Sequence, residues 1–198
     1  MSYNRRYRKA IHILAGFPAF LLKVLTLEQM MLFGVCMLVA SWLLRPNWPW
    51  LRELAKPEDL DRRYIAGVRH YFVAVLALIV LFGARHSELA TAGWLALAWG
   101  DGAAGLVGGK VRLPWNPSKT LAGFLACILL IYLAIAASCA WSGAAADWMR
   151  WQVQVFIVLV AAAVSVAESL HLPMDDNYIV SLGTASLLYA GTALLHLW

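Results

Sequence analysis

An aspartate inside an apolar run is the residue of this chain whose setting most suggests chemistry. Asp101 lies in a stretch of about 22 mostly apolar residues, long enough to cross a bilayer, and a short basic segment that includes Lys119 follows it. Placing an ionisable group at membrane depth costs about 2.5 to 3.5 kcal/mol on insertion scales, so such groups usually serve a function. Gly102 and Gly105 follow the aspartate. They favour either close helix packing or the approach of a phosphate or metal ion to the backbone.

The segment LPWNPSKT comes next, and its two prolines stiffen it. Ser118 or Thr120 can cap the helix expected directly after it, which places Lys119 beside a helix N-terminus. A cation there has the wrong sign for the helix dipole, but a phosphate bound between them satisfies both. We therefore take Asn116, Ser118 and Lys119 as candidate phosphate ligands. The alternative is that Lys119 only sets membrane topology.

A third cluster, ESLHLPMDDN, joins two apolar runs. Glu168 ends the first run, Pro173 is expected to end its helix, and Asp175 and Asp176 precede the next run with Asn177 as a candidate cap. Adjacent carboxylates at a helix start can simply favour the helix dipole. Together with the Asn177 amide they also offer oxygen ligands for Mg²⁺, which prefers one or two carboxylates together with substrate phosphates. Asn177 is therefore also a candidate nucleotide or phosphate ligand.

The fourth cluster lies near the N-terminus. Arg8 and His12 are four residues apart and share a helix face, and Lys9 lies beside them. The two cations fit a topology signal as well as a phosphate site. His12 falls about one turn into the first apolar run, where it can bind a phosphate or act as an acid or base.

The elements that must position these clusters are membrane helices. The chain has 198 residues, of which 62% are hydrophobic and only 14% charged, too few charges for a soluble globular surface. It has no repeat or linker, so we expect one domain over residues 1–198. The expected fold is all-α, with about seven transmembrane helices around a polar cavity. The apolar runs cover residues 11–25, 27–44, 64–82, 89–109, 121–141, 151–170 and 178–197, and the first is expected to be tilted or broken.

Basic residues indicate the orientation of this bundle. With a cytoplasmic N-terminus, twelve Lys and Arg fall on the cytoplasmic side and three on the other, a strong positive-inside asymmetry. The polar clusters then face the cytoplasm, and the C-terminus at Trp198 lies on the outer side of the cell (inner) membrane. The basic residues flank apolar runs, so nucleic acid is not an expected partner. The long hydrophilic connection, residues 45–63, is expected to be largely solvated.

The four ordered motifs RKAIH, GDGAAGLVG, NPSKTLAG and ESLHLPMDDNY resemble the CTP-dependent polyprenol, dolichol and phytol kinases, a family related to the phosphatidate cytidylyltransferases. The resemblance implies phosphoryl transfer from CTP to the hydroxyl of a membrane lipid such as a polyprenol, phytol or diacylglycerol, with Mg²⁺, on the cytosolic face. It extends to further positions within these motifs, among them Gly102, Gly105, Gly123 and Pro173. The acidic residue often found after the lysine is replaced here by Leu121 and Ala122.

The roles we expect follow from charge, because phosphoryl transfer depends mainly on positioning and charge neutralisation. Asp101, Asp175 and Asp176 are expected to hold Mg²⁺ with the triphosphate, while Arg8, Lys9 and Lys119 neutralise phosphate oxygens. Glu168 or Asp101 accepts the proton of the lipid hydroxyl. One alternative is a cytidylyltransferase that makes a CDP-activated lipid. Another is a transporter with a proton or ion path through Asp101, Arg69 and His12, which would place ionisable groups near the midplane and on both sides of the membrane.

Overall fold

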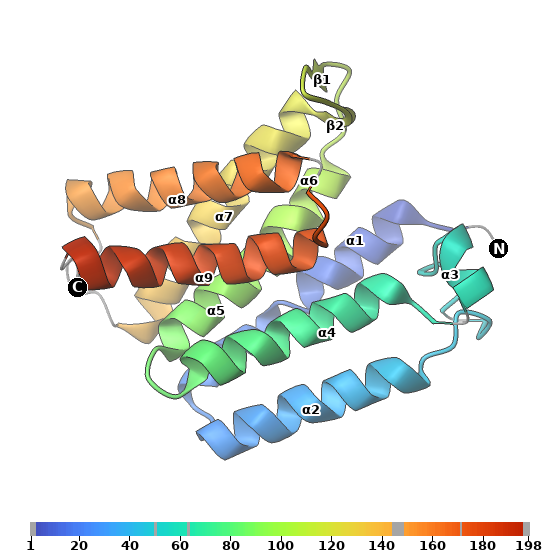
Figure 1. Ribbon diagram of the computed structural model, residues 1–198, viewed down its shortest axis with the longest axis horizontal. Coiled ribbons are helices and arrows are strands. Elements are labelled where there is room, and N and C mark those ends of the chain that lie inside the picture. The colour runs from blue at the N-terminus through green and yellow to red at the C-terminus, as the bar shows by residue number, and fades with distance from the viewer. Residues whose placement is uncertain (1–2, 50, 63, 144–148, 171, 196–198) are drawn as a thin grey trace.

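The computed structural model describes residues 3–49, 51–62, 64–143, 149–170 and 172–195, and Trp198 lies outside them. The described chain is a helical bundle with one small hairpin (Figure 1). Three helical stretches, 66–83, 121–142 and 151–169, are long and apolar enough to cross a membrane, and the apolar helix 27–43 is shorter. The chain therefore has the helical, membrane-associated character that its composition predicts.

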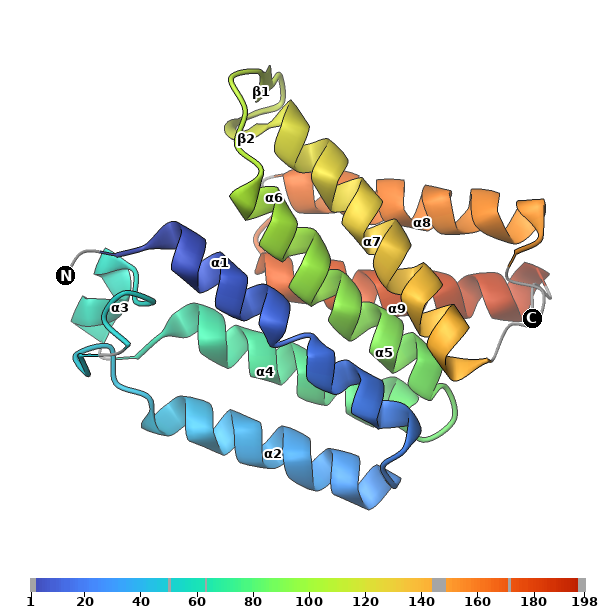
Figure 2. The same cartoon turned by 180° about the vertical axis from the view of Figure 1, so that it is seen from behind.

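The first apolar run is broken, as expected. Helix α1 covers Arg5–Leu14 and a 3₁₀ helix, η1, covers Phe17–Lys23. Gly16 separates them, and a Cβ at this position would lie 2.5 Å from the Cβ of Ala98. Pro18 in the first turn of η1 supports the new start. The break lets both pieces lie against the middle of the bundle (Figure 2).

The remaining apolar runs form the helices of the bundle close to the predicted bounds. Helix α2 covers Leu27–Leu43, and α4 (Ala66–Leu78) continues into the π-helical segment η2 (Ile79–Gly83). Helix α7 covers Leu121–Ser142, α8 covers Trp151–Ser169 and α9 covers Asp176–Leu195. Helix α8 ends at Ser169, four residues before Pro173, so that proline does not itself end the helix.

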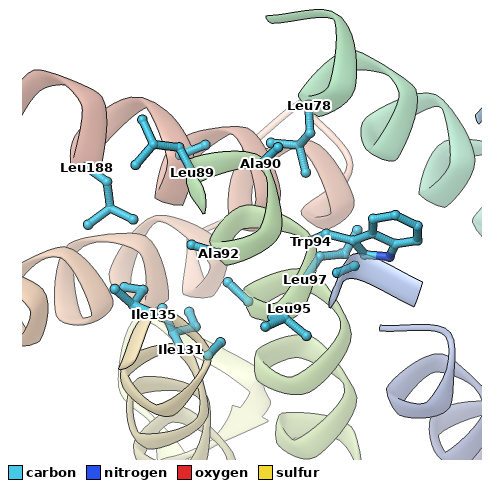
Figure 3. Packing of buried hydrophobic residues seen from close by; sticks show 14 of the residues in the cluster. Leu78, Leu89, Ala90, Ala92, Trp94, Leu95, Leu97, Ile131, Ile135 and Leu188 are labelled. Carbon is cyan, nitrogen blue, oxygen red and sulfur yellow. The ribbon is translucent and has the colours of Figure 1, made fainter. Parts of the chain in front are cut away.

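The centre of the bundle is helix α5, Ser87–Leu95, in which every residue from Leu89 to Leu95 is buried. A helix that is apolar on all sides has to be surrounded, and α5 packs against η1, α7 and α9. Figure 3 shows Trp94 and Leu97 on one side of this core and Ile131 and Ile135 of α7 on the other. The Trp94 ring nitrogen donates to Tyr71 Oη at 2.7 Å, so its polar atom is satisfied.

After α5 the same helix changes its pitch. A π-helical segment, η3, covers Ala96–Asp101, and the short helix α6 covers Gly102–Leu106. Each π-type bond spans one more residue than an α-helical bond, so η3 turns the following residues relative to α5. The turn directs Asp101 toward α1. The helix ends at Leu106, three residues before the predicted end of the run.

Two connections are folded where the sequence predicted loops. Strands β1 (Arg112–Leu113) and β2 (Asn116–Thr120) pair antiparallel, a hairpin that the all-α expectation missed. The long hydrophilic connection contains helix α3, Pro57–Arg62, and a small apolar cluster around Leu51. Asp59 is only 3% exposed and accepts from two backbone N–H groups, at Lys56 and Ala66. The described part of this connection is mostly exposed, as predicted, and Asp59 is the one buried residue of α3, which it ties to the start of α4.

Candidate active site

Polar side chains from both ends of the chain line a cavity of about 530 Å³ at the end of the bundle that carries α3, α6 and the hairpin (Figures 1 and 2). Three carboxylates and five cations line it: Asp101, Glu168, Asp176, Arg5, Lys9, Lys56, Arg112 and Lys119. The described lining is therefore rich in cations, an arrangement that suits a polyanion with several phosphates.

On one side of the cavity Lys9 holds Asp101. The Lys9 ammonium donates to both carboxylate oxygens at 2.8 Å and to the backbone oxygen of the same residue at 3.0 Å. The two side chains are 17% and 19% exposed, so water screens the pair little. Lys9 reaches across Gly105, where a Cβ would collide with its Cε and lie 2.9 Å from its Cδ. Gly105 therefore makes room for a lysine.

Gly102 has a similar use one turn further along the same face of α1. A Cβ there would lie 2.5 Å from Ile13 Cγ1, and His12 lies close by. The His12 ring nitrogen Nε2 lies 3.1 Å from the backbone oxygen of Leu97 and 3.4 Å from Asp101 Oδ2. Both glycines thus let α1 approach α6, and the carboxylate of Asp101 faces two basic side chains of α1.

Lys119 holds the two acids on the opposite side of the cavity. Its ammonium lies 2.6 Å from Glu168 Oε1 and 3.4 Å from Asp176 Oδ2, and it also donates to the backbone oxygen of Glu168. Burial alone lowers the pKa of Lys119, but Glu168 and then Asp176 outweigh burial and hold that pKa above its ordinary value. Lys119 therefore stays charged throughout the neutral range.

The hairpin positions Lys119 because its turn is fixed to the end of α8. Asn116 is 2% exposed and donates from Nδ2 to the backbone oxygen of Ser169 at 2.9 Å, and Trp115 donates to Ser169 Oγ at 2.9 Å. Asn116 Oδ1 accepts from the Ser118 backbone and hydroxyl. Of the two uncharged candidate phosphate ligands in this segment, Asn116 anchors the hairpin, while Ser118 lines the cavity.

Thr120 caps the helix that follows the hairpin. Its hydroxyl accepts from the Gly123 N–H at 3.1 Å, which confirms one of the two predicted caps of α7. A Cβ on Gly123 would lie 2.9 Å from the backbone oxygen of Ala104, so this glycine lets α7 approach α6. The small residues of the motif thus bring Asp101 and Lys119 to the same cavity.

Asp175 and Asp176 separate, because adjacent residues at a helix start point about 100° apart. Asp176 lines the cavity, whereas Asp175 Oδ2 lies 2.8 Å from His70 Nδ1. Asp175 Oδ1 also accepts from the Asn177 N–H at 3.0 Å, so Asp175 is the cap and Asn177 lies inside α9. Burial raises the pKa of Asp176, and the pair with Lys119 offsets this only in part.

Arg8 lies outside the cavity. It lines a smaller cavity between α1 and α4, together with His12. Its guanidinium lies against Gly67, where a Cβ would be 2.5 Å from Nη2. Of the three predicted phosphate-binding groups of α1, the structure brings Lys9 into the larger cavity and places Arg8 in the smaller one.

The acids of the larger cavity fit a metal ion that is shared with a ligand. Among the described residues, no group of three or more His, Cys, Asp and Glu side chains is placed to hold a metal ion by itself. Asp101 and Asp176 both line the cavity, and Mg²⁺ typically takes one or two carboxylates with phosphate oxygens. Asp175, the third predicted metal ligand, is engaged by His70 instead.

Three cations of the cavity were not among the predicted site residues, although Arg112 belongs to the basic segment that follows Asp101. Arg5 precedes the recognised motif by one turn, Arg112 belongs to the hairpin, and Lys56 belongs to the connection before α3. The position of Arg5 could have been predicted from the sequence, because Arg5 lies four residues before Lys9 and so on the same helix face. The position of Lys56 could not have been predicted in this way, because it depends on how the long connection folds.

Comparisons with known proteins point to one group. The chain is 25% identical over 158 residues to phytol kinase 1 of Arabidopsis thaliana, a match that covers 76% of this chain and 51% of the relative. It is 34% identical over 137 residues to a probable phytol kinase of Triticum aestivum, covering 62% of this chain and 44% of the relative. The chain spans about half the length of these chloroplast proteins. No family model and no solved structure matches it.

Proposed function

We propose that this chain, a relative of the phytol kinases, transfers the terminal phosphoryl group of a nucleoside triphosphate to the hydroxyl of a long-chain membrane alcohol, with CTP as the donor. The observation that carries the proposal is the cavity that Lys9, Asp101, Lys119, Glu168 and Asp176 line together. A prenol-like acceptor and a charged donor need a site with these groups near apolar helices.

The lysines of the cavity supply the charge that the donor needs. Lys9 and Lys119 are each paired with carboxylates in the structure, at 2.8 Å and 2.6 Å. A bound triphosphate offers these lysines phosphate oxygens in place of carboxylate oxygens. Arg5, Lys56 and Arg112 add positive charge around the same ligand. Phosphoryl transfer depends mainly on such positioning and neutralisation, so the cavity fits its requirements.

The carboxylates are then available to a metal ion. Asp101 and Asp176 are the residues that would hold Mg²⁺ here, and the ion would supply further charge neutralisation at the phosphates. Glu168 is 5% exposed and stays beside Lys119, where it orients that ammonium.

In the transfer itself, the hydroxyl oxygen of the alcohol forms a bond to the terminal phosphorus. The bond from that phosphorus to the bridging oxygen breaks, and the nucleoside diphosphate leaves. The hydroxyl proton passes to a carboxylate of the cavity, Asp101 or Glu168. The products are the lipid phosphate and the diphosphate, with no other reactant consumed.

The proposed setting is a multi-pass protein of the cell membrane. We propose that the apolar runs form about seven spans and that the cavity faces the cytoplasm, where nucleotides are found. The bias of Lys and Arg toward one side of the predicted spans supports this orientation. Helix α2 is short for a perpendicular span, so thinning of the bilayer or snorkelling of its flanking residues would be needed.

A labelling experiment tests the proposal. The purified chain in detergent or liposomes is given CTP labelled at the α or the γ phosphate, with polyprenol, phytol, geranylgeraniol or diacylglycerol. A kinase puts only γ label into the lipid product, and a cytidylyltransferase puts in α label. ATP, GTP and UTP in parallel identify the donor. Asp101→Asn and Lys119→Ala should each lose most of the transfer, and near-wild-type turnover of either variant would refute the assignment of the site.

A further inference from the structure

A second cavity lies beside the first, between α1 and α4. Its volume is about 100 Å³ and its lining is mostly apolar: Ile11, Ala15, Leu54, Val68, Tyr71 and Phe72. Two basic side chains, Arg8 and His12, and Gly67 complete it. A water molecule occupies about 30 Å³ in the liquid, so this cavity has room for a hydroxyl group and the first few carbons attached to it.

Helix α1 lies between the two cavities, and each cavity is lined by a different face of this helix. Arg5 and Lys9 face the larger cavity, while Arg8, Ile11 and Ala15 face the smaller one. At about 100° per residue, these two faces are roughly 90° apart around the helix, and His12 lies between them. His12 is therefore the residue of α1 at the border of the two cavities.

The contacts of His12 extend to both sides of this border. Its side chain is 15% exposed, and its ring meets the Tyr71 ring edge-on at 4.9 Å inside the smaller cavity. Its Nε2 atom lies 3.4 Å from Asp101 Oδ2, a carboxylate that lines the larger cavity. A group bound next to the His12 ring in the smaller cavity is therefore one side chain away from the proposed phosphate site.

We propose, on the basis of the proposed function, that the α1–α4 cavity receives the hydroxyl end of the acceptor alcohol. The apolar lining suits the first carbons of a prenol, and His12 gives the hydroxyl a hydrogen-bond partner at the border with the phosphate site. Arg8 provides a cation for the phosphate that the alcohol carries after transfer. The rest of the hydrocarbon chain extends into the bilayer.

A second apolar surface offers the clearest rival position for the alcohol. A groove of about 350 Å³ runs between α8 and α9, lined by residues that include Ala163, Tyr178, Leu182 and Gly183. Among its described lining residues none carries a charge, and Asp101 and His12 are not among them. This groove can hold a lipid tail, but it offers a hydroxyl no basic partner.

Filling each cavity separates the two positions. Val68→Phe places a ring in the α1–α4 cavity, and Gly183→Leu fills the α8–α9 groove, where a Cβ meets only Val164 at 3.8 Å. We expect Val68→Phe to raise the KM for the alcohol roughly tenfold or more and to leave the KM for the nucleotide within about twofold. Gly183→Leu should change neither value. The opposite pattern would overturn the proposal.

The polar contact is tested at His12 itself. His12→Ala should raise the KM for the alcohol and lower kcat, and His12→Asn should recover part of both because an amide can still bond a hydroxyl. His86→Gln is the matched control. It changes a histidine of the turn between η2 and α5 that pairs with Glu88 at 3.4 Å. Equal losses in the His12→Ala and His86→Gln variants would contradict a hydroxyl partner at His12.

Photolabelling of the wild-type chain needs no turnover and therefore separates this proposal from the proposed function. A geranylgeraniol analogue with a diazirine close to its hydroxyl is irradiated with the chain, without nucleotide, and the labelled peptides are mapped. Label in residues 66–78 of α4, displaced by free geranylgeraniol, supports the site even if no kinase activity is found. Label in α8 or α9 overturns it. Label in α4 that free geranylgeraniol does not displace, found with a preparation that has kinase activity, also counts against it.

Discussion

Replacement of Gly105 by alanine tests the central contact of the site. The new Cβ would collide with the Cε of Lys9 and lie 2.9 Å and 3.0 Å from its Cδ and Cγ. These atoms belong to a flexible side chain, so we expect Lys9 to swing away from Asp101 while the backbone stays in place. The Lys9 ammonium would then lose three hydrogen bonds of 2.8 to 3.0 Å.

The expected loss is larger in activity than in stability. Alanine gains about 1 kcal/mol over glycine within a helix, which offsets much of the lost ion pair. A hydrogen bond to a charged group is worth about 1.5 to 3 kcal/mol, so a displaced Lys9 should lower kcat/KM roughly 10- to 150-fold. Thermal unfolding in detergent micelles should change little. The assay is transfer of γ label from CTP to a prenol.

Two controls show whether the effect acts through Lys9. Gly108→Ala adds the same methyl group in the same cavity, where no atom lies within 4 Å of the new Cβ, and it should stay near wild-type. Lys9→Ala removes the colliding side chain, so Gly105→Ala should have no further effect in that background. If Gly105→Ala costs as much activity in the Lys9→Ala background as in the wild-type chain, or if Gly108→Ala costs as much, the reasoning is refuted.

Three further predictions concern Lys119, its partners and the start of α7. Lys119→Met leaves the carboxylate of Glu168, whose side chain is 6% exposed, without its cation, so the free energy of unfolding should fall by up to about 3 kcal/mol. The double variant Lys119→Met/Glu168→Gln should regain stability by chemical denaturation but not activity, and failure to regain it would contradict this pairing. Thr120→Ala removes the hydroxyl that caps α7 at the Gly123 N–H and should lower the free energy of unfolding by about 1 kcal/mol, while Thr120→Ser should keep most of this stability. Because burial raises the pKa of Asp176, its charged form opposes folding above the ordinary value of 3.8. Asp176→Asn should thus raise the unfolding midpoint at pH 7, with a smaller effect below pH 3.8, and equal shifts at both pH values would contradict it.

The bounds of the helices were predictable because long apolar runs end where polar residues begin. Thr120 was also predictable as a cap, since a hydroxyl before an apolar run has a clear local role. Local pattern does not decide which of two adjacent acids faces a cavity. Asp175 and Asp176 differ by one position, and the choice depends on where α9 starts.

The positions of several site residues could not be predicted from the sequence, because they depend on contacts between distant segments or on an irregular helical turn. The place of Lys56 depends on the buried carboxylate of Asp59, which fixes α3 to α4. The direction of Asp101 depends on the π-helical turn of η3, for which the sequence carried no recognised signal. Asn116 was expected to bind phosphate as part of the segment LPWNPSKT, and the local pattern did not indicate that its amide also holds the hairpin to the end of α8.

The cavity takes its walls from α1 and from α9, and α1 is synthesised well before α9. Lys9 and Asp101 can neutralise each other once η3 has been made, before α8 and α9 are synthesised. Lys119 has to wait for α8 and α9 before Glu168 and Asp176 can meet it. If the hairpin lies at the membrane surface, as the proposed topology has it, Lys119 lacks these partners during biogenesis, and anionic lipid headgroups are natural temporary counter-ions for it.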